Sequence, residues 1–170
     1  MILAKRPFVP RACRLALIAL AGLVAGCQSV DPAPRSVAAS GAWRVVERLG
    51  DVRYLPPGSA GWSPAVAGNP LPAASRVITG VGGRVILAGA GRQVSAEPSS
   101  RFALPDGLPQ HELEQSSGTL RYRIATPESE PLRVATRFLN LAASESVFEV
   151  SVGPHAAEVV VERGQLRIVT

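Results

Sequence analysis

Hydrophobic residues recur in short runs from Trp43 onward, and many of these runs alternate between apolar and polar positions. In residues 120–124 the apolar side chains take every second position, with Arg121 and Arg123 between them. This period of two predicts strands with one buried and one solvent-exposed face. Gly, Pro or Asp bounds most of the runs, as expected where strands end in turns. The predicted strands are residues 43–49, 52–55, 76–79, 84–87, 93–96, 101–104, 120–124, 132–134, 150–152, 159–162 and 166–168.

The spacing of these runs predicts an all-β domain. No stretch of helical periodicity is long enough to matter, and about ten short strands at this spacing indicate an antiparallel β-sandwich or β-roll. Trp43 and Tyr122 lie within the strand patterns and are expected in the core. The last strand lies close to Thr170, and an open edge there would favour aggregation unless a partner covers it.

The first 26 residues have the three zones of a secretory signal. Four basic residues precede or flank a ten-residue apolar run, 15–24, which is too short to cross a bilayer. Residues 24–27, Val-Ala-Gly-Cys, resemble the lipobox of bacterial lipoproteins. The resemblance implies cleavage after Gly26, acylation of Cys27 and a stable lipid anchor. The alternative is an ordinary signal peptide with a chance cysteine.

The residues after the cysteine bear on location and on domain boundaries. In the sorting rule of lipoproteins an Asp after the cysteine retains the protein in the inner membrane. Gln28 stands there instead, so the resemblance implies the periplasmic face of the outer membrane. Residues 27–41 are rich in Ser, Ala and Pro, which predicts a flexible tether, with an ordered edge strand as the alternative. The all-β domain is then expected over residues 42–170.

Removal of the signal changes the charge balance. The chain has 18 Lys and Arg against 13 Asp and Glu, but four of the cations and none of the acids precede Cys27. A nearly neutral mature chain gives no case for a nucleic-acid partner. Cys13 leaves with the signal and Cys27 carries the lipid, so no disulfide is expected in the mature chain. Its stability must come from a hydrophobic core.

Four groups of motifs, in their order along the chain, resemble the FecR-type periplasmic domain. They are residues 43–55 with the Gly50-Asp51 turn, 68–80 ending in Ile78-Thr79-Gly80, 83–102 with Gly91-Arg92 and the Pro98-Ser99-Ser100 corner, and 118–166 with Thr126-Pro127, the Ala135–Phe138 segment and the Glu162-Arg163-Gly164 turn. The resemblance covers the chain from Trp43 to its C-terminus.

The chain also departs from the family pattern at three positions. Ala135 stands where the family has Gly, and Ala90 stands where the family has the Asp of an Asp-Gly turn. Arg163 is an additional residue before Gly164. The best-known members are anti-sigma regulators with a cytoplasmic segment and a transmembrane helix, and we identify neither here. The resemblance therefore implies an extracytoplasmic recognition module without the regulatory role.

Candidate catalytic and metal-binding patterns are weak. Residues 61–65, Gly-Trp-Ser-Pro-Ala, resemble half of a nucleophile elbow, but Pro64 lacks the N–H that would act as an oxyanion donor. The segment that begins at His111 lacks the second His of the zincin motif, and His155 stands alone. We therefore expect no enzyme activity, no metal and no cofactor. A glycosidase with an unidentified carboxylate pair is the enzymatic alternative.

Two features are candidate binding residues. Trp62 lies in a Pro/Gly-rich loop, where it either serves as an exposed anchor or packs over the sheet. The second feature is a set of four arginines, Arg121, Arg123, Arg133 and Arg137. If their strands pair, these side chains share one face of the sheet, and that face would suit an anionic sugar, a lipid phosphate or an acidic protein. The alternative is a solvated face on which the arginines have Glu partners across the strands.

These features together favour a non-enzymatic module, anchored to the membrane by lipid, that recognises an envelope protein or a cell-wall polymer. The alternative is a structural subunit of an envelope or secretion assembly. The sequence leaves the oligomeric state open.

Overall fold

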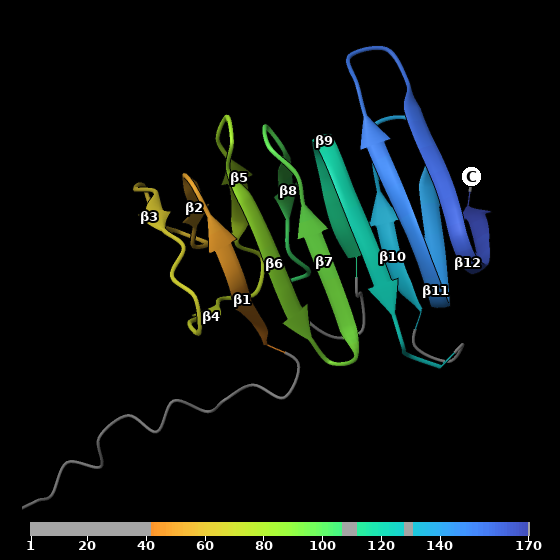
Figure 1. Cartoon of the computed structure of the whole chain (residues 1–170), viewed down its shortest axis with the longest axis horizontal. Coiled ribbons are helices and arrows are strands. Elements are labelled where there is room, and N and C mark those ends of the chain that lie inside the picture. The colour runs from red at the N-terminus through yellow and green to blue at the C-terminus, as the bar shows by residue number, and fades with distance from the viewer. Residues whose placement is uncertain (1–41, 107–111, 128–130, 170) are drawn as a thin grey trace, which may run out of the picture. The chain divides into compact units, whose positions relative to one another are not determined.

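The computed structural model describes residues 42–106, 112–127 and 131–169, and within them the chain forms strands, turns and loops (Figure 1). The described residues contain no helix, which confirms the all-β prediction, and they therefore contain no helix that could span a membrane. The strands are β1 (Trp43–Leu49), β2 (Val52–Leu55), β3 (Ser63–Pro64), β4 (Pro70–Leu71), β5 (Arg76–Thr79), β6 (Arg84–Gly89), β7 (Arg92–Ala96), β8 (Arg101–Ala103), β9 (Glu112–Ile124), β10 (Leu132–Ala135), β11 (Asn140–Val152) and β12 (Ala157–Val169). The predicted signal and tether, with Cys27, lie outside the described residues, as does His111.

All twelve strands belong to one sheet, which curls so that two walls face each other across the core. The front wall contains β4, β1, β6 and β7, followed by the C-terminal parts of β9 and β11 and the first part of β12. The back wall contains β3, β2, β5 and β8, the first part of β9, then β10, the first part of β11 and the last part of β12. Figure 1 shows β1, β6 and β7 in front of β2, β5 and β8. Among the strand pairs of the described residues, only β9 with β10 is parallel.

The two walls are joined along a row of tight bends. The β1–β2, β5–β6 and β7–β8 connections turn from one wall to the other, whereas β9, β11 and β12 continue through bends. Each bend contains a residue with positive φ, a conformation that glycine adopts without strain. These residues are Gly50, Gly82, Ser99, Gly118, Glu145 and Gly164. Neighbouring bends are bonded to one another, since the Ser99 N–H donates to the Gly80 carbonyl.

The core fills the space between the walls with side chains from alternate strand positions. Trp43 is 6% exposed and Tyr122 is fully buried, as predicted for both. The Tyr122 ring stacks on Phe148, with 4.9 Å between ring centroids. Residues 120–124 keep their apolar side chains inside and Arg121 and Arg123 outside, so the period of two in the sequence corresponds to the two faces of the front wall.

The sequence pattern recovered the short strands except the two-residue strands β3 and β4, and it did not recover the full length of the long ones. Strands β9, β11 and β12 each have 13 residues, whereas the pattern indicated only short parts of each. The alternation shifts phase at each bend: Leu113 and Gln115 are buried before Gly118, and Leu120 and Tyr122 after it. When the alternation changes phase within a strand, the sequence pattern predicts two short strands or no strand in that part of the chain.

Candidate functional site

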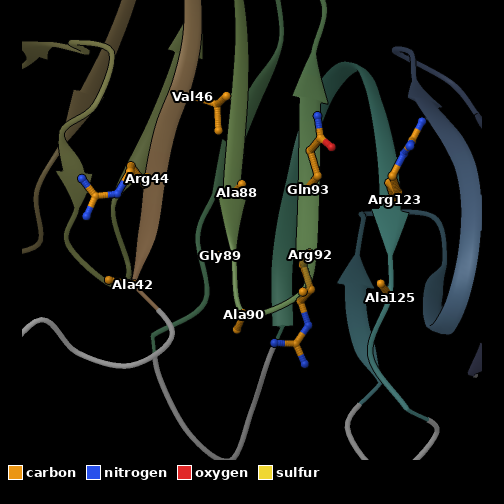
Figure 2. Close-up of a pocket in the computed structure, with 11 residues that line it drawn as sticks. Ala42, Arg44, Val46, Ala88, Gly89, Ala90, Arg92, Gln93, Arg123 and Ala125 are labelled. Carbon is orange, nitrogen blue, oxygen red and sulfur yellow. The ribbon is translucent and has the colours of Figure 1, made fainter.

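An open groove lies on the outer face of the front wall, over the start of β1 and the β6–β7 hairpin (Figure 2). We call it the arginine groove. It has a volume of about 530 Å³, within the range of small-molecule sites. Its lining residues are Ala42, Arg44, Val46, Ala88, Gly89, Ala90, Gly91, Arg92, Gln93, Arg123 and Ala125.

Strand register places three polar side chains of the groove, those of Arg44, Gln93 and Arg123, in one row. Arg44 pairs with Ala88 across β1 and β6, and Ala88 pairs in turn with Gln93 on β7. Gln93 pairs with Arg123 on β9. Residues directly opposite each other in antiparallel strands point to the same side. The neighbours Val45, Leu87, Val94 and Tyr122 fill the core, so the row points outward.

The floor of the groove is low because its residues are small. Ala88 separates the Arg44 side from the pair formed by Gln93 and Arg123, as Figure 2 shows. At one end the two-residue turn Ala90-Gly91 joins β6 to β7, with φ of 46° and 72°. Positive φ at both positions fits a type I′ hairpin turn, which matches the twist of the strands. The turn keeps bulky side chains away from that end of the groove.

The described lining of the groove is positive. Arg44 and Arg123 are exposed, Arg92 is buried, and none of the described lining residues carries a carboxylate. Arg44 donates from Nη1 to the Gly68 carbonyl, which holds its side chain at one side of the groove. Arg123 is exposed and forms no ion pair with any residue that the structure describes. From β1 to β9 the row spans three strand spacings, or about 14 Å. It therefore suits an extended acidic ligand better than a single small anion.

The four predicted arginines do not share a face. Arg121 and Arg123 lie on the outer face of the front wall, where Arg121 forms an ion pair with Glu162. Arg133 lies on the back wall and pairs in register with Glu112, and Arg137 follows β10 there. The prediction of one common face was wrong, because β10 pairs with the first part of β9, before the bend at Gly118 carries β9 to the front wall.

The surroundings of Arg137 are of mixed charge. A shallow depression on the back wall is lined by Arg137 together with Glu112 and Glu114. The Arg137 guanidinium lies 5.2 Å from the centre of the Phe138 ring, within the range of a cation–π contact. Both acids compete with any anion for Arg137, so this depression is a weaker anion site than the arginine groove.

Trp62 lies in the loop that contains β3 and β4, and its side chain is 43% exposed. Its exposure favours the first of the two alternatives of the sequence, an exposed side chain. It is not among the residues that line the arginine groove. Its role as a binding anchor remains a hypothesis.

Among the described residues, the structure brings no further catalytic or metal-binding side chain to the candidate patterns of the sequence. Ser63 lies on β3, and Pro64 follows it in the same short strand. No group of three or more His, Cys, Asp or Glu gathers among the residues that the structure describes. Burial raises the pKa of Tyr122 well above its ordinary value of 10.0, but the phenol lies in the core, away from any open pocket.

Three polar residues of the groove, Arg44, Arg92 and Gln93, were not identified as candidate binding residues from the sequence. The alternation in β1 does place Arg44 outward, between buried Trp43 and Val45. What the sequence lacks is the strand order, which sets Arg44 beside Ala88 and Gln93 beside Arg123.

Comparison of the chain with protein-family models, curated proteins and solved structures gave no match.

Proposed function

We propose that this chain is a non-enzymatic recognition module of the bacterial cell envelope, and that it binds an acidic, extended cell-wall polymer in the arginine groove. The lipobox-like segment that ends at Cys27 would anchor it to the outer membrane on the periplasmic face. The resemblance to FecR-type domains supports a recognition module. The observation that carries the proposal is the row from Arg44 to Arg123, which holds two outward-facing arginines and an amide over a floor of small residues. None of the described residues that line the groove carries a carboxylate.

The chemistry of the row fits carboxylate groups. A guanidinium can donate two parallel hydrogen bonds to one carboxylate, and the Gln93 amide can donate to a carbonyl or hydroxyl. Arg44 and Arg123 lie about three strand spacings apart, roughly 14 Å, so one polymer can reach both. The small floor residues admit a flat ligand against the sheet.

The test is co-sedimentation of the full chain, in detergent, with purified peptidoglycan, which is insoluble and carries carboxylates. We expect the wild type to pellet with the polymer and the double variant Arg44→Glu/Arg123→Glu to bind roughly tenfold less, since two charge-assisted contacts are reversed. The matched control is Arg76→Glu/Arg101→Glu, which makes the same charge change at exposed positions of the back wall. It should bind like the wild type.

Two outcomes would overturn the proposal. Equal loss in both double variants would show a general charge effect rather than a site, and unchanged binding in the groove variant would exclude the groove. A neutral glucan resin provides the background value for each protein.

A structural subunit of an envelope assembly is the second candidate function. The observation that favours it is the long strand β12, which has only one neighbouring strand among the described residues. One co-purifying protein in constant ratio, without retained peptidoglycan, would favour this candidate.

A further inference from the structure

The two ends of the curled sheet differ in how their edges are protected. At the β1–β2 end, β3 pairs with β2 and β4 pairs with β1. These strands have two residues each and contain Pro64 and Pro70. Short strands and proline, which has no N–H to donate, prevent further strand pairing. This end of the sheet is closed.

The opposite end is open along its whole length. Strand β12 has 13 residues, contains no proline, and pairs only with β11 among the described residues. Val161 and Ile168 lie opposite the core residues Phe148 and Leu141, yet they are 47% and 68% exposed. The core therefore ends at β12 with apolar side chains uncovered, which marks an interaction surface.

The inward face of β12 changes phase at its middle. Val159 pairs with buried Val150 and Leu166 pairs with buried Ala143, so the side chains of Val159 and Leu166 both point toward the core. In an unbroken strand, residues an odd number of positions apart, as these two are, would lie on opposite faces. The pairing register shifts between these two positions, next to the bend at Gly164. Glu162 and Arg163 lie at this shift. The outward positions include Glu158 before it and Arg167 after it.

We infer that β12 pairs antiparallel with β12 of a second copy of this chain, around a two-fold axis between Glu162 and Arg163. With Glu162 opposite Arg163 of the second copy, Val159 lies opposite Leu166 and Glu158 lies opposite Arg167. Each of these pairs occurs twice. The phase shift at the centre makes every inward position of one copy face an inward position of the other, so both walls and the core continue across the axis.

Charge complementarity selects a second copy as the occupant. In this register each of the four charged residues of β12 meets an opposite charge. Glu158, Arg163 and Arg167 form no ion pair with other described residues, while Glu162 contacts Arg121. A slip by one residue turns inward side chains against outward ones. A slip by two residues places Glu158 opposite Gln165 or Val169 and removes the charge pairing. This inference is independent of the arginine groove.

A charge-swap experiment on the full chain in detergent tests the pairing by sedimentation equilibrium. The wild type should show a monomer–dimer equilibrium. Glu158→Arg alone and Arg167→Glu alone each set like charges opposite one another twice, and should raise the dissociation constant roughly tenfold. An equimolar mixture of the two single variants should form heterodimers of wild-type strength, because each introduced charge then faces its opposite.

The matched control is Glu47→Arg, an exposed residue on β1 that lies at the other end of the front wall. It should dimerise like the wild type. If the wild type remains monomeric at all concentrations, the inference is overturned. The same outcome is expected if another part of the same chain covers β12. A mixture that stays monomeric also overturns it.

Disulfide trapping tests the register itself. In a Cys13→Ser/Cys27→Ser background, the double variant Glu158→Cys/Arg167→Cys should form an oxidised dimer, because directly opposite residues come close enough for a disulfide. Within one copy these positions are nine residues apart on a strand, about 30 Å, so the bond must join two chains. Each single cysteine variant should form no disulfide-linked dimer. Equal trapping of the single variants, or none of the double variant, contradicts the proposed pairing.

Discussion

Tyr122 donates its phenolic hydrogen to Gln115 across 2.9 Å inside the core, and neither side chain is exposed to solvent. The two residues belong to the same strand, on opposite sides of the bend at Gly118. The Gln115 amide also donates to the carbonyls of Gly118 and Val150, at 2.9 Å each. This buried network ties the bend of β9 to β11, so the curvature of the sheet depends on polar groups that water does not reach.

Removal of the Tyr122 hydroxyl should destabilise the fold at neutral pH and flatten its alkaline pH dependence. Tyr122→Phe leaves the buried Gln115 oxygen without its donor, at a cost of about 1–3 kcal/mol. Burial raises the pKa of Tyr122 above 10.0. The unfolded chain therefore loses this proton at a lower pH than the folded chain, and the free energy of unfolding falls as the pH rises above about 10.

Urea denaturation between pH 7 and pH 11 measures this effect. The difference between wild type and Tyr122→Phe should narrow as the pH rises, because only the wild type loses the Tyr122 contribution. Tyr54→Phe is the control, since it keeps Tyr122 and should keep the alkaline decline. Parallel curves for wild type and Tyr122→Phe would contradict the assignment.

Gly118 is required by space as well as by conformation. Its φ is +86°, and a Cβ there would lie 2.3 Å from Ser100 Oγ and 2.5 Å from Ser100 Cα. Gly68 has nearly the same φ, +87°, but a Cβ there would meet nothing within 4 Å. Gly68→Ala should therefore cost only the strain of positive φ, about 1–2 kcal/mol. Gly118→Ala should cost about 3 kcal/mol or more, because overpacking adds to the same strain. Equal thermal shifts for the two variants would show that the contact with Ser100 relaxes freely.

The Thr79 hydroxyl joins two neighbouring bends. Its Oγ1 donates to the Glu97 carbonyl at 2.7 Å and accepts from the Ser100 N–H at 2.8 Å. Thr79→Val keeps the shape of the side chain but leaves both backbone groups without this partner, so we expect a loss of about 1–3 kcal/mol in urea denaturation. Thr79→Ser retains the hydroxyl and should lose clearly less. A larger loss in the serine variant would point to the methyl group as the important part.

Ala90 offers a stabilising substitution. It takes a positive φ of 46° at the first position of the two-residue turn Ala90-Gly91. Type I′ turns favour Asn, Asp or Gly at this position because these residues adopt positive φ more readily. Ala90→Asn should raise the free energy of unfolding by about 0.5–1 kcal/mol. The same exchange at Ala88, which lies within β6, should not stabilise the fold, and a gain at both sites would reject the turn as the cause.

The proposed lipid anchor depends on Cys27. Cys27→Ser should move the protein from the membrane fraction to the soluble fraction of cells, or leave an unprocessed precursor, because serine offers no thiol for acylation. Cys13 lies in the predicted signal and is not expected to be acylated. Cys13→Ser should therefore not alter the distribution of the protein between the two fractions. Radiolabelled palmitate provides the direct readout, and its incorporation into the Cys27→Ser protein would contradict the prediction.

The local part of the fold was accessible from the sequence. The bounds of β1, β2 and β5 were predicted as the structure has them, since Gly50, the prolines after Leu55 and Gly80 end these strands sharply. The core positions of Trp43 and Tyr122 were likewise readable from alternation. Strands β9 and β11 were only partly identified, because their polar stretches and their bends interrupt the period of two.

The candidate site depended on contacts between strands far apart in the sequence. Arg121 and Arg123 were recognisable as outward-facing, but the expectation that Arg133 joins them was wrong. Arg44 became part of the site only through the strand order that places β1 beside β6 and β7 beside β9. Side-chain alternation reports which residues share a face within one strand, and it contains no information about which strands are neighbours.

The sequence by itself determined the all-β class, most of the short strands, the faces of those strands and the turns that separate them, because these follow from the local period of side chains and from the conformations that Gly and Pro adopt. Only the tertiary structure decided that the long strands bend from one wall to the other, that the arginines divide between two faces, and that one edge is closed while β12 is open. Those features arise from pairing and packing between distant segments, whose free energy no local stretch of the chain contains.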